Sequence, residues 1–131
     1  MSLTALVVDD SMLIRHMVCR FLEERGFQVE SAANGVEALE MIARSRPSII
    51  ITDLQMPLMT GTELITELKA RDHTAAIPIV ILSNKRTAAD AHEEHRAQFV
   101  IYKDIDIEDQ LANAIAALSR EPAKSDDPIT R

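Results

Sequence analysis

The sequence has few of the residues that mark secreted or membrane proteins. Its 131 residues include one cysteine, Cys19, and no tryptophan. A single thiol cannot form an internal disulfide, and no cysteine spacing typical of a metal site exists, which favours a reducing cytoplasm. No apolar run approaches the roughly 20 residues that cross a bilayer, and the N-terminus lacks the basic-then-apolar pattern of a signal peptide. We therefore expect a cytoplasmic protein with no membrane contact.

Basic side chains are also scarce, with 14 Lys and Arg against 21 Asp and Glu and a formal net charge of -7. Because nucleic-acid binding depends on clustered Lys and Arg, this balance argues against a nucleic-acid partner for the chain alone. The 47% of hydrophobic side chains can bury one core, and the chain is too short for two ordinary domains. We predict one domain over residues 1–120 and a polar, disordered tail over residues 121–131.

Short apolar runs alternate with longer segments of helical period, which is the pattern of βα units in a parallel sheet. The run Ile49-Ile50-Ile51 indicates a central strand that is buried on both faces. The five predicted strands are residues 3–8, 27–31, 48–52, 77–82 and 99–102. The predicted helices begin near residues 11, 34, 61, 86 and 107.

Two of these helices carry more specific expectations. In the helix after residue 34, the core-facing side chains should be Val36, Leu39 and either Ile42 or Ala43. In the helix over residues 86–96, only alanines and histidines occupy the inward positions, so it can bury little apolar area. We expect that helix to be loosely anchored.

Polar residues interrupt the apolar pattern where the predicted strands end. Asp9 and Asp10 follow the first strand, Asp53 the third, Ser83 the fourth and Lys103 the fifth. In an open parallel sheet these carboxyl ends form one edge, and ligands bind there in the crevice where the strand order reverses. We therefore expect these five side chains to lie close together.

The chemistry of this group indicates a metal and a phosphoryl group. Three carboxylates held together resist joint ionisation unless a cation offsets their charge. Oxygen ligands without nearby cysteine or clustered histidine favour Mg²⁺, or Mn²⁺, over zinc. Lys103 and the Ser83 hydroxyl offer a charge and a donor to the remaining phosphoryl oxygens. The pattern predicts a phosphoryl-transfer site.

The motifs Asp9-Asp10-Ser11 and Asp53-Leu54-Gln55-Met56-Pro57-Leu58-Met59-Thr60-Gly61, followed by Ser83 and Lys103, have the order and spacing of response-regulator receiver domains. The chain resembles this family over roughly residues 3 to 119. The resemblance implies an α/β fold with a five-stranded parallel sheet in the order 2-1-3-4-5 and helices on both faces, the flavodoxin-like or CheY-like arrangement. It also implies a signalling phosphoacceptor of a two-component system that assists its own phosphorylation, and not an enzyme acting on other substrates.

The resemblance assigns a role to each matching position. Asp53 is the nucleophile that forms an acyl phosphate, and Ser83 and Lys103 contact the phosphoryl group. Asp10 binds the metal directly, while Asp9 acts mostly through a metal-bound water. The implied metal-binding residues are Asp9, Asp10, Asp53 and, through its backbone carbonyl, Gln55.

The resemblance further implies a phosphodonor, which is a histidine kinase or a histidine phosphotransfer protein. Such a donor commonly docks beside the first helix, whose exposed face should include Arg15 and His16. Phosphorylation would pull Ser83 inward and repack the helix over residues 86–96 with the fifth strand. The face formed by that helix, the fifth strand and the final helix would then bind an unknown downstream target or form a phosphorylation-dependent homodimer. The chain departs from the family at Val100, where an aromatic switch residue is usual, and at Asp104, where proline is usual.

Four other functions fit the sequence less well. A metal-dependent phosphatase of similar topology needs an Asp-x-Asp arrangement after the first strand, which Asp9-Asp10-Ser11 lacks. A flavodoxin-like cofactor binder needs a phosphate loop rich in Ser, Thr and Gly, whereas two aspartates in that place would repel the phosphate. A pseudo-receiver that interacts without phosphate remains the alternative, although the acidic set is complete. His92 and His95 are three apart, whereas the helical zinc motif of metalloproteases needs histidines four apart.

Overall fold

The fold was analysed in a computed structural model that describes residues 3–83, 97–103 and 106–126. The helix predicted over residues 86–96 and the departure at Asp104 lie outside the described residues. None of the described helices is long and apolar enough to span a membrane.

The centre of the fold is a five-stranded sheet in which every neighbouring pair is parallel. The spatial order β2-β1-β3-β4-β5 confirms the predicted order. The strands are β1 (Leu3–Val8), β2 (Phe27–Ala32), β3 (Ile49–Asp53), β4 (Ile79–Ser83) and β5 (Phe99–Tyr102). Because the order reverses direction at β1 and β3, the chain leaves these two neighbouring strands toward opposite faces of the sheet.

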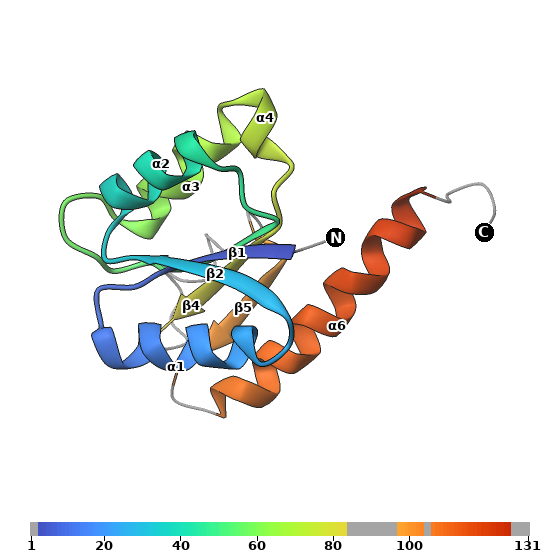
Figure 1. The fold of residues 1–131 in the computed structure, drawn as a ribbon. Coiled ribbons are helices and arrows are strands. Elements are labelled where there is room, and N and C mark those ends of the chain that lie inside the picture. Colours follow the sequence, from blue (N-terminus) through green and yellow to red (C-terminus); the bar gives the residue numbers. More distant parts are fainter. Residues whose placement is uncertain (1–2, 84–96, 104–105, 127–131) are drawn as a thin grey trace.

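Helices cover both faces of the sheet (Figure 1). One face carries α1 (Met12–Glu23) and α6 (Ile107–Asp126). The other carries α2 (Gly35–Arg44) and α3 (Gly61–Lys69), followed by the single turn α4 (Asp72–Ala75).

Two apolar cores lie between the helices and the sheet. Alternate residues of a strand point to opposite faces, so Val7 and Ile51 belong to the core under α1 and α6, whereas Val8 and Ile50 belong to the core under α2 and α3. All five residues of β3 are buried, as the sequence predicts for a central strand. The buried strands that support the residues at their carboxyl ends therefore consist largely of continuous β-branched runs.

Side-chain caps fix where three helices begin. Ser11 accepts the Ile14 N–H at the start of α1, and Asn34 accepts the Glu37 N–H at the start of α2. Thr60 and Glu63 form a reciprocal capping box at the start of α3. The caps Ser11 and Thr60 end the two loops that carry the predicted acidic residues, so these loops are short and defined at both ends.

The prediction for the inward face of α2 was partly wrong. Ile42 is buried and Leu39 is partly buried against the core, as predicted, but Val36 is 40% exposed and Ala38 is fully buried in its place. The buried positions Gly35, Ala38 and Ile42 are spaced by three and four residues, so the helical stripe begins with two small residues. A Cβ at Gly35 would meet the Met59 side chain, so close packing against the neighbouring loop selects this stripe.

The segment after α3 contains a helical turn that the predicted elements do not include. The helix ends at Lys69, and α4 follows as a separate turn. Thr74 is buried in that turn, and its hydroxyl donates a hydrogen bond to the Leu68 carbonyl at 2.7 Å. Since this bond satisfies the helix end with a side chain, apolar periodicity gives no sign of it.

The last helix, α6, continues to Asp126, beyond residue 120, where the sequence predicts that the polar tail begins. Figure 1 shows the end of this helix extending away from the sheet. The division of the chain at residue 120 stays a prediction.

Two leucines of α1 differ in how far their side chains are exposed, and this difference provides a test of the fold. Leu22 is 0% exposed, whereas Leu13 is 76% exposed. We expect Leu22→Ala to lower the free energy of unfolding by about 2–5 kcal/mol, because the substitution leaves a cavity in the core. Leu13→Ala should change it by no more than about 0.5 kcal/mol. Urea unfolding followed by circular dichroism measures both, and equal losses would contradict the described packing of α1.

Candidate functional site

The five predicted polar residues lie at one edge of the sheet. Asp9 and Asp10 directly follow β1, and Lys103 directly follows β5. Asp53 and Ser83 are the last residues of β3 and β4. Because all five strands run in the same direction, their carboxyl ends meet there, and the expected convergence is confirmed for the carboxylates and the lysine by the distances between them.

The three carboxylates form a tight group. One oxygen of each of Asp9, Asp10 and Asp53 lies within 4.8 Å of the other two. Asp9 is 0% exposed and Asp53 is 2% exposed, whereas Asp10 is exposed. Two charges are therefore removed from water and the third faces the solvent, so a ligand would approach from the side of Asp10.

The ammonium of Lys103 pairs with both buried carboxylates. Its Nζ lies 2.8 Å from Asp9 Oδ2 and 3.4 Å from Asp53 Oδ2. Among the described residues, this one cation faces three carboxylates, so the cluster keeps a surplus of negative charge. The surplus is the electrostatic reason to expect a further cation at this place.

Asp53 shows the effect of this surplus most clearly. Burial is the main cause that raises its pKa above the ordinary value of 3.8, and the Asp9 carboxylate adds to the rise. Lys103 and the Gln55 backbone N–H act in the opposite direction and lower the pKa. Asp53 Oδ1 accepts the Leu54 N–H at 2.8 Å and the Gln55 N–H at 3.4 Å, so one oxygen is held by the loop backbone while the other faces Lys103.

Asp9 is held by its own loop and by α1. Its Oδ1 accepts the Ser11 N–H at 2.8 Å, and its backbone carbonyl accepts the Arg15 Nη1 at 2.7 Å. Its Oδ2 is buried, and its partner among the described residues is the Lys103 ammonium at 2.8 Å. A cation already compensates this oxygen, and the remaining negative charge of the cluster comes from the other two carboxylates.

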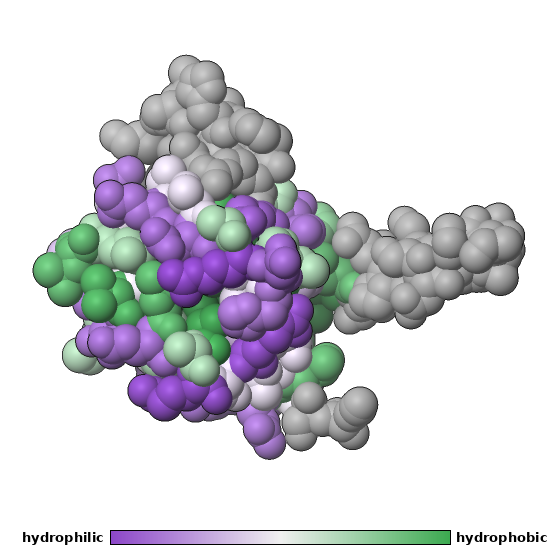
Figure 2. Space-filling view, turned by 90° about the horizontal axis from the view of Figure 1, so that it is seen from above, coloured by the Kyte–Doolittle hydropathy of each residue, from purple (hydrophilic) through white to green (hydrophobic). Residues whose placement is uncertain are grey.

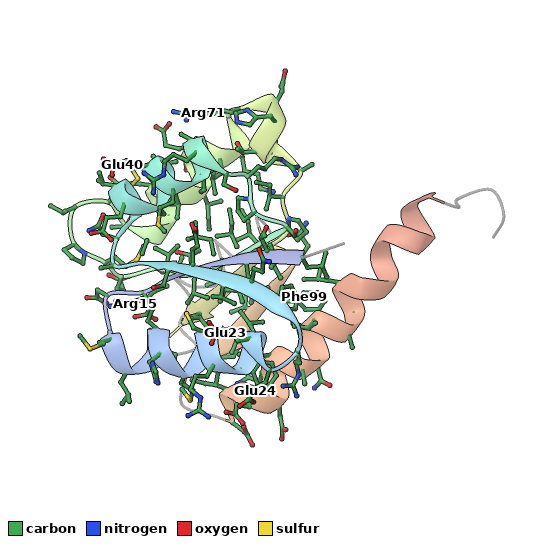
Figure 3. All side chains as sticks on the ribbon, in the orientation of Figure 1. Arg15, Glu23, Glu24, Glu40, Arg71 and Phe99 are labelled. Carbon is green, nitrogen blue, oxygen red and sulfur yellow. The ribbon has the colours of Figure 1, made fainter. Side chains whose placement is uncertain are left out.

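The position of Arg15 corrects a prediction. We expected it on the exposed face of the first helix, but it is half-buried, and Figure 3 shows it beside the turn between β1 and α1. Its hydrogen bond to the Asp9 carbonyl makes it part of the support of the acidic loop. His16 is exposed, as expected. The expectation concerned the docking face of the first helix, and the sequence does not show that a long side chain there bends back toward its own N-terminal turn.

The loop between β3 and α3 is tightly folded against Asp53. Leu58 has a φ of 70°, and the Met59 N–H donates to the Pro57 carbonyl at 2.7 Å. These two features define a γ-turn with a positive φ at its central residue, which is the strained form of this turn. A Cβ at Gly61 would collide with the backbone oxygen of Asp53, so this position requires glycine. The motif after Asp53 therefore has a steric basis as well as a chemical one.

Ser83 and Gln55 occupy the expected places in the chain. Ser83 is 3% exposed, and its backbone carbonyl accepts the Lys103 N–H at 2.8 Å, which ties the ends of β4 and β5 together. Gln55 is exposed beside Asp53. The roles of the Ser83 hydroxyl and the Gln55 carbonyl stay predictions.

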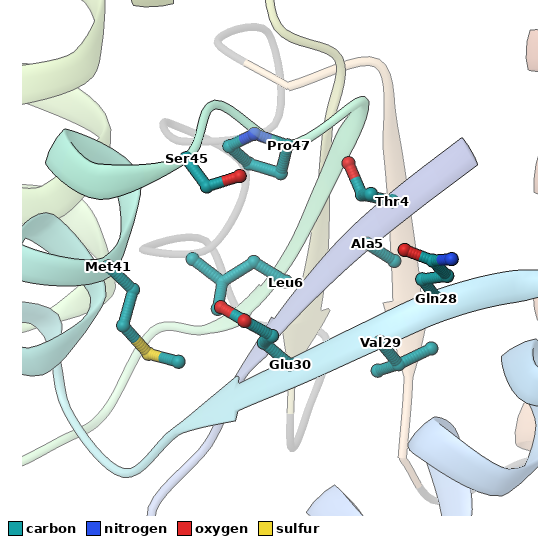
Figure 4. A pocket seen from close by; sticks show the side chains of 9 residues that line it. All are labelled: Thr4, Ala5, Leu6, Gln28, Val29, Glu30, Met41, Ser45 and Pro47. Atoms are coloured by element: carbon teal, nitrogen blue, oxygen red, sulfur yellow. The ribbon is translucent and has the colours of Figure 1, made fainter. Parts of the chain in front are cut away.

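A pocket beside β2, the outer strand on the side of the sheet opposite β5, is separate from the acidic cluster. It has a volume of about 230 Å³ and lies between β1, β2 and the end of α2, where Glu30, Met41 and Ser45 line it (Figure 4). Its lining includes no residue of the acidic cluster. This pocket is therefore separate from the candidate site.

The comparison with protein families decides the relationship. A profile described as the response regulator receiver domain matches residues 5–116. The chain belongs to the response-regulator receiver family. A receiver domain is a signalling domain of two-component systems, so the resemblance seen in the sequence is confirmed.

Curated relatives include the response regulator MprA of Mycobacterium ulcerans, which is 34% identical over 129 residues, covering 97% of this chain and 55% of the relative. MprA of Mycobacterium leprae is 35% identical over 124 residues, covering 93% of this chain and 53% of the relative. The chain thus spans about half the length of the curated relatives it matches.

Similar solved structures include the chemotaxis protein CheY4 of Vibrio cholerae, with a TM-score of 0.81, 30% identity and coverage of 89% of this chain and 98% of that one. The receiver domain of a signal transduction histidine kinase from Syntrophus aciditrophicus has a TM-score of 0.81 and 29% identity, and the match covers 90% of this chain and 91% of that one.

The raised pKa of Asp53 predicts how this receiver responds to pH without a divalent ion. Between the unfolded value near 3.8 and the higher folded value, the folded protein binds more protons, so its stability falls as the pH rises. We expect Asp53→Asn to raise the free energy of unfolding at neutral pH, and this gain to shrink as the pH falls toward 3.8. Urea unfolding with a chelator, at a series of pH values, measures the difference.

The matched control for this pH series is Asp72→Asn, which removes an exposed carboxylate of α4. It should show no comparable gain at neutral pH. A gain for Asp53→Asn that stayed constant down to acid pH, or a loss at neutral pH, would contradict the assignment of burial and Asp9 as the causes.

Proposed function

We propose that this receiver accepts a phosphoryl group on Asp53 from a histidine kinase or a histidine phosphotransfer protein, in an Mg²⁺-dependent reaction in the cytoplasm. One observation carries the proposal: the Lys103 ammonium lies between the buried carboxylates of Asp9 and Asp53, with the Asp10 carboxylate beside them. This arrangement combines an acceptor oxygen with a cation for a phosphoryl oxygen and a set of oxygen ligands for a metal.

The residues present fit a magnesium ion. The cluster sets three carboxylates against the one ammonium that pairs with them among the described residues, and it offers only oxygen ligands. Asp10, Asp53 and the backbone carbonyl of Gln55 would hold the ion, with Asp9 acting mostly through water. When bound, the ion would neutralise charge on the acceptor and on the phosphoryl oxygens.

The chain's own residues would perform the transfer by position and charge. The Asp53 carboxylate forms an O–P bond while the P–N bond to the donor histidine breaks, and the electron pair of that bond returns to the imidazole nitrogen. Leu54 and Gln55 hold the acceptor through their backbone N–H groups, which fixes its direction of attack. Lys103 and the Ser83 hydroxyl would take the phosphoryl oxygens that form.

The surface around the site favours a protein as the donor. Met12 and Leu13 begin α1 and are 73% and 76% exposed, and Leu58 in the loop after Asp53 is 80% exposed. Hydrophobic side chains gather at the left end of Figure 2, the end where the loop between β3 and α3 lies in Figure 1. Exposed apolar side chains of this size, next to charged ones, are typical of a protein-binding surface.

We expect Mg²⁺ with acetyl phosphate, a small phosphodonor, to add one phosphoryl mass to the protein. Asp53→Asn should abolish the adduct, because the amide cannot act as the nucleophile. Intact-mass spectrometry is the suitable measurement, since the chain has no tryptophan whose fluorescence could report on the site.

The control for this experiment is Asp72→Asn, which should form the adduct at the wild-type rate because this carboxylate is exposed and remote from the sheet edge. An adduct that persisted in Asp53→Asn would show that the phosphoryl group sits elsewhere. Its absence from the wild-type protein at every Mg²⁺ concentration would favour the phosphate-independent pseudo-receiver.

Metal binding can be tested without phosphorylation. We expect Asp10→Asn to weaken Mg²⁺ binding by about tenfold or more, since the substitution removes a direct ligand and a negative charge. Titration of amide NMR shifts near Asp53 measures the dissociation constant, with Asp72→Asn as the unaffected control. If Asp10→Asn bound Mg²⁺ as tightly as the wild-type protein, Asp10 would not be a ligand.

A further inference from the structure

The strand that delivers Lys103 lies at the edge of the sheet. In β5, Tyr102 pairs in register with Ser83, and the Lys103 N–H donates to the Ser83 carbonyl at 2.8 Å. Peptide groups alternate in direction along a strand, so the N–H and the carbonyl of Tyr102 point away from β4. An edge strand leaves such groups without a neighbouring strand, and they need other partners where water is excluded.

The side chain of Gln110 meets both of these groups. Its Oε1 accepts the Tyr102 N–H at 3.0 Å, and its Nε2 donates to the Tyr102 carbonyl at 2.8 Å. One carboxamide thus replaces one residue of a sixth strand, with a donor and an acceptor in the same plane. Two hydrogen bonds to one residue fix the orientation of the peptide groups as well as their position.

Gln110 is itself well anchored in the first turns of α6. Its backbone N–H donates to the Asp106 carbonyl at 3.3 Å, and the Asp106 carboxylate accepts the Asp109 N–H at 3.3 Å. The adjacent Leu111 is 0% exposed and belongs to the core between α6 and the sheet. The carboxamide is therefore held by a packed helix rather than by a free loop.

Lys103 is the next residue after Tyr102, and its ammonium pairs with Asp9 and Asp53. We propose that Gln110 is a positioning residue for the phosphoryl-transfer site, acting through the Tyr102 backbone to fix the place of Lys103. This inference rests on the proposed function, because Lys103 is the group that would meet the phosphoryl oxygens.

The physical reason is the difference between one-sided and two-sided support. With Gln110, the end of β5 is bonded to Ser83 of β4 on one side and to α6 on the other. Without it, the Tyr102 N–H and carbonyl lose these two hydrogen bonds, while the bonds of the four-residue strand to β4 remain. Lys103 would then sample several positions, and a transfer that depends on a fixed cation would slow.

The substitution Gln110→Met tests the proposal, because methionine keeps the length of the side chain and removes both hydrogen bonds. The matched control is Asn113→Met, at an exposed position one turn further along α6. At saturating Mg²⁺, we expect the rate of phosphorylation by acetyl phosphate to fall about tenfold in Gln110→Met and to stay unchanged in Asn113→Met. The dissociation constant for Mg²⁺ should stay within about twofold of wild type, because the metal ligands lie on other strands.

A double-variant cycle distinguishes a positioning role of Gln110, acting through Lys103, from a purely structural role. If Gln110 acts through Lys103, adding Gln110→Met to Lys103→Ala should cause no further loss of rate. If the two losses multiply, or if Gln110→Met also weakens Mg²⁺ binding by the same factor, the inference is wrong. Should Gln110→Met fail to fold, Gln110→Glu replaces it, since a carboxylate keeps the acceptor and removes the donor to the Tyr102 carbonyl; it should also slow the reaction.

The outcomes distinguish this inference from the proposed function. If the wild-type protein and Asn113→Met gain a phosphoryl group and Gln110→Met gains it at the same rate, Gln110 has no positioning role and the function stands. If neither the wild-type protein nor Asn113→Met is phosphorylated, both proposals fall together. A selective loss of rate in Gln110→Met that disappears in the Lys103→Ala background supports both.

Discussion

The organisation of this receiver depends on the repulsion among three carboxylates at the end of a parallel sheet. Asp9 and Asp53 are buried there with Asp10 beside them, and among the described residues the ammonium of Lys103 is the cation that pairs with them. Burial of ionised groups without full compensation costs stability, which is reflected in the raised pKa of Asp53. A cation bound at this cluster would therefore offset part of that cost.

The fold can hold such a cluster because the layers beneath it are rigid. The strands β1, β3 and β4 are buried nearly throughout, and the helix caps Ser11 and Thr60 limit the loops above them to a few residues. The close approach of Gly61 to the Asp53 backbone leaves the loop after β3 little freedom. Asp9 and Asp53 are thus fixed by local hydrogen bonds and burial, so these two carboxylates cannot relax their repulsion by moving apart.

Much of this follows from the sequence because two strong signals coincide. Apolar runs fix the strands, and the parallel arrangement then brings Asp53 and Lys103 to one edge without any knowledge of distances. The sequence was less informative where small or polar side chains make the decisive contacts. Ala38 rather than Val36 faces the core, and Arg15 bends toward the Asp9 carbonyl. The bonds of Gln110 to Tyr102 depend on which peptide groups a strand leaves outward, and hydropathy carries no information about them.

The two charged partners of the site differ in how firmly the fold holds them. Asp53 ends the central strand β3, which has neighbours on both sides, whereas Lys103 follows the four-residue edge strand β5. On the outer side of β5, the two hydrogen bonds of Gln110 to the Tyr102 backbone take the place of a neighbouring strand. The place of Asp53 therefore depends on two flanking strands, whereas that of Lys103 depends on β4 and on a single side chain of α6.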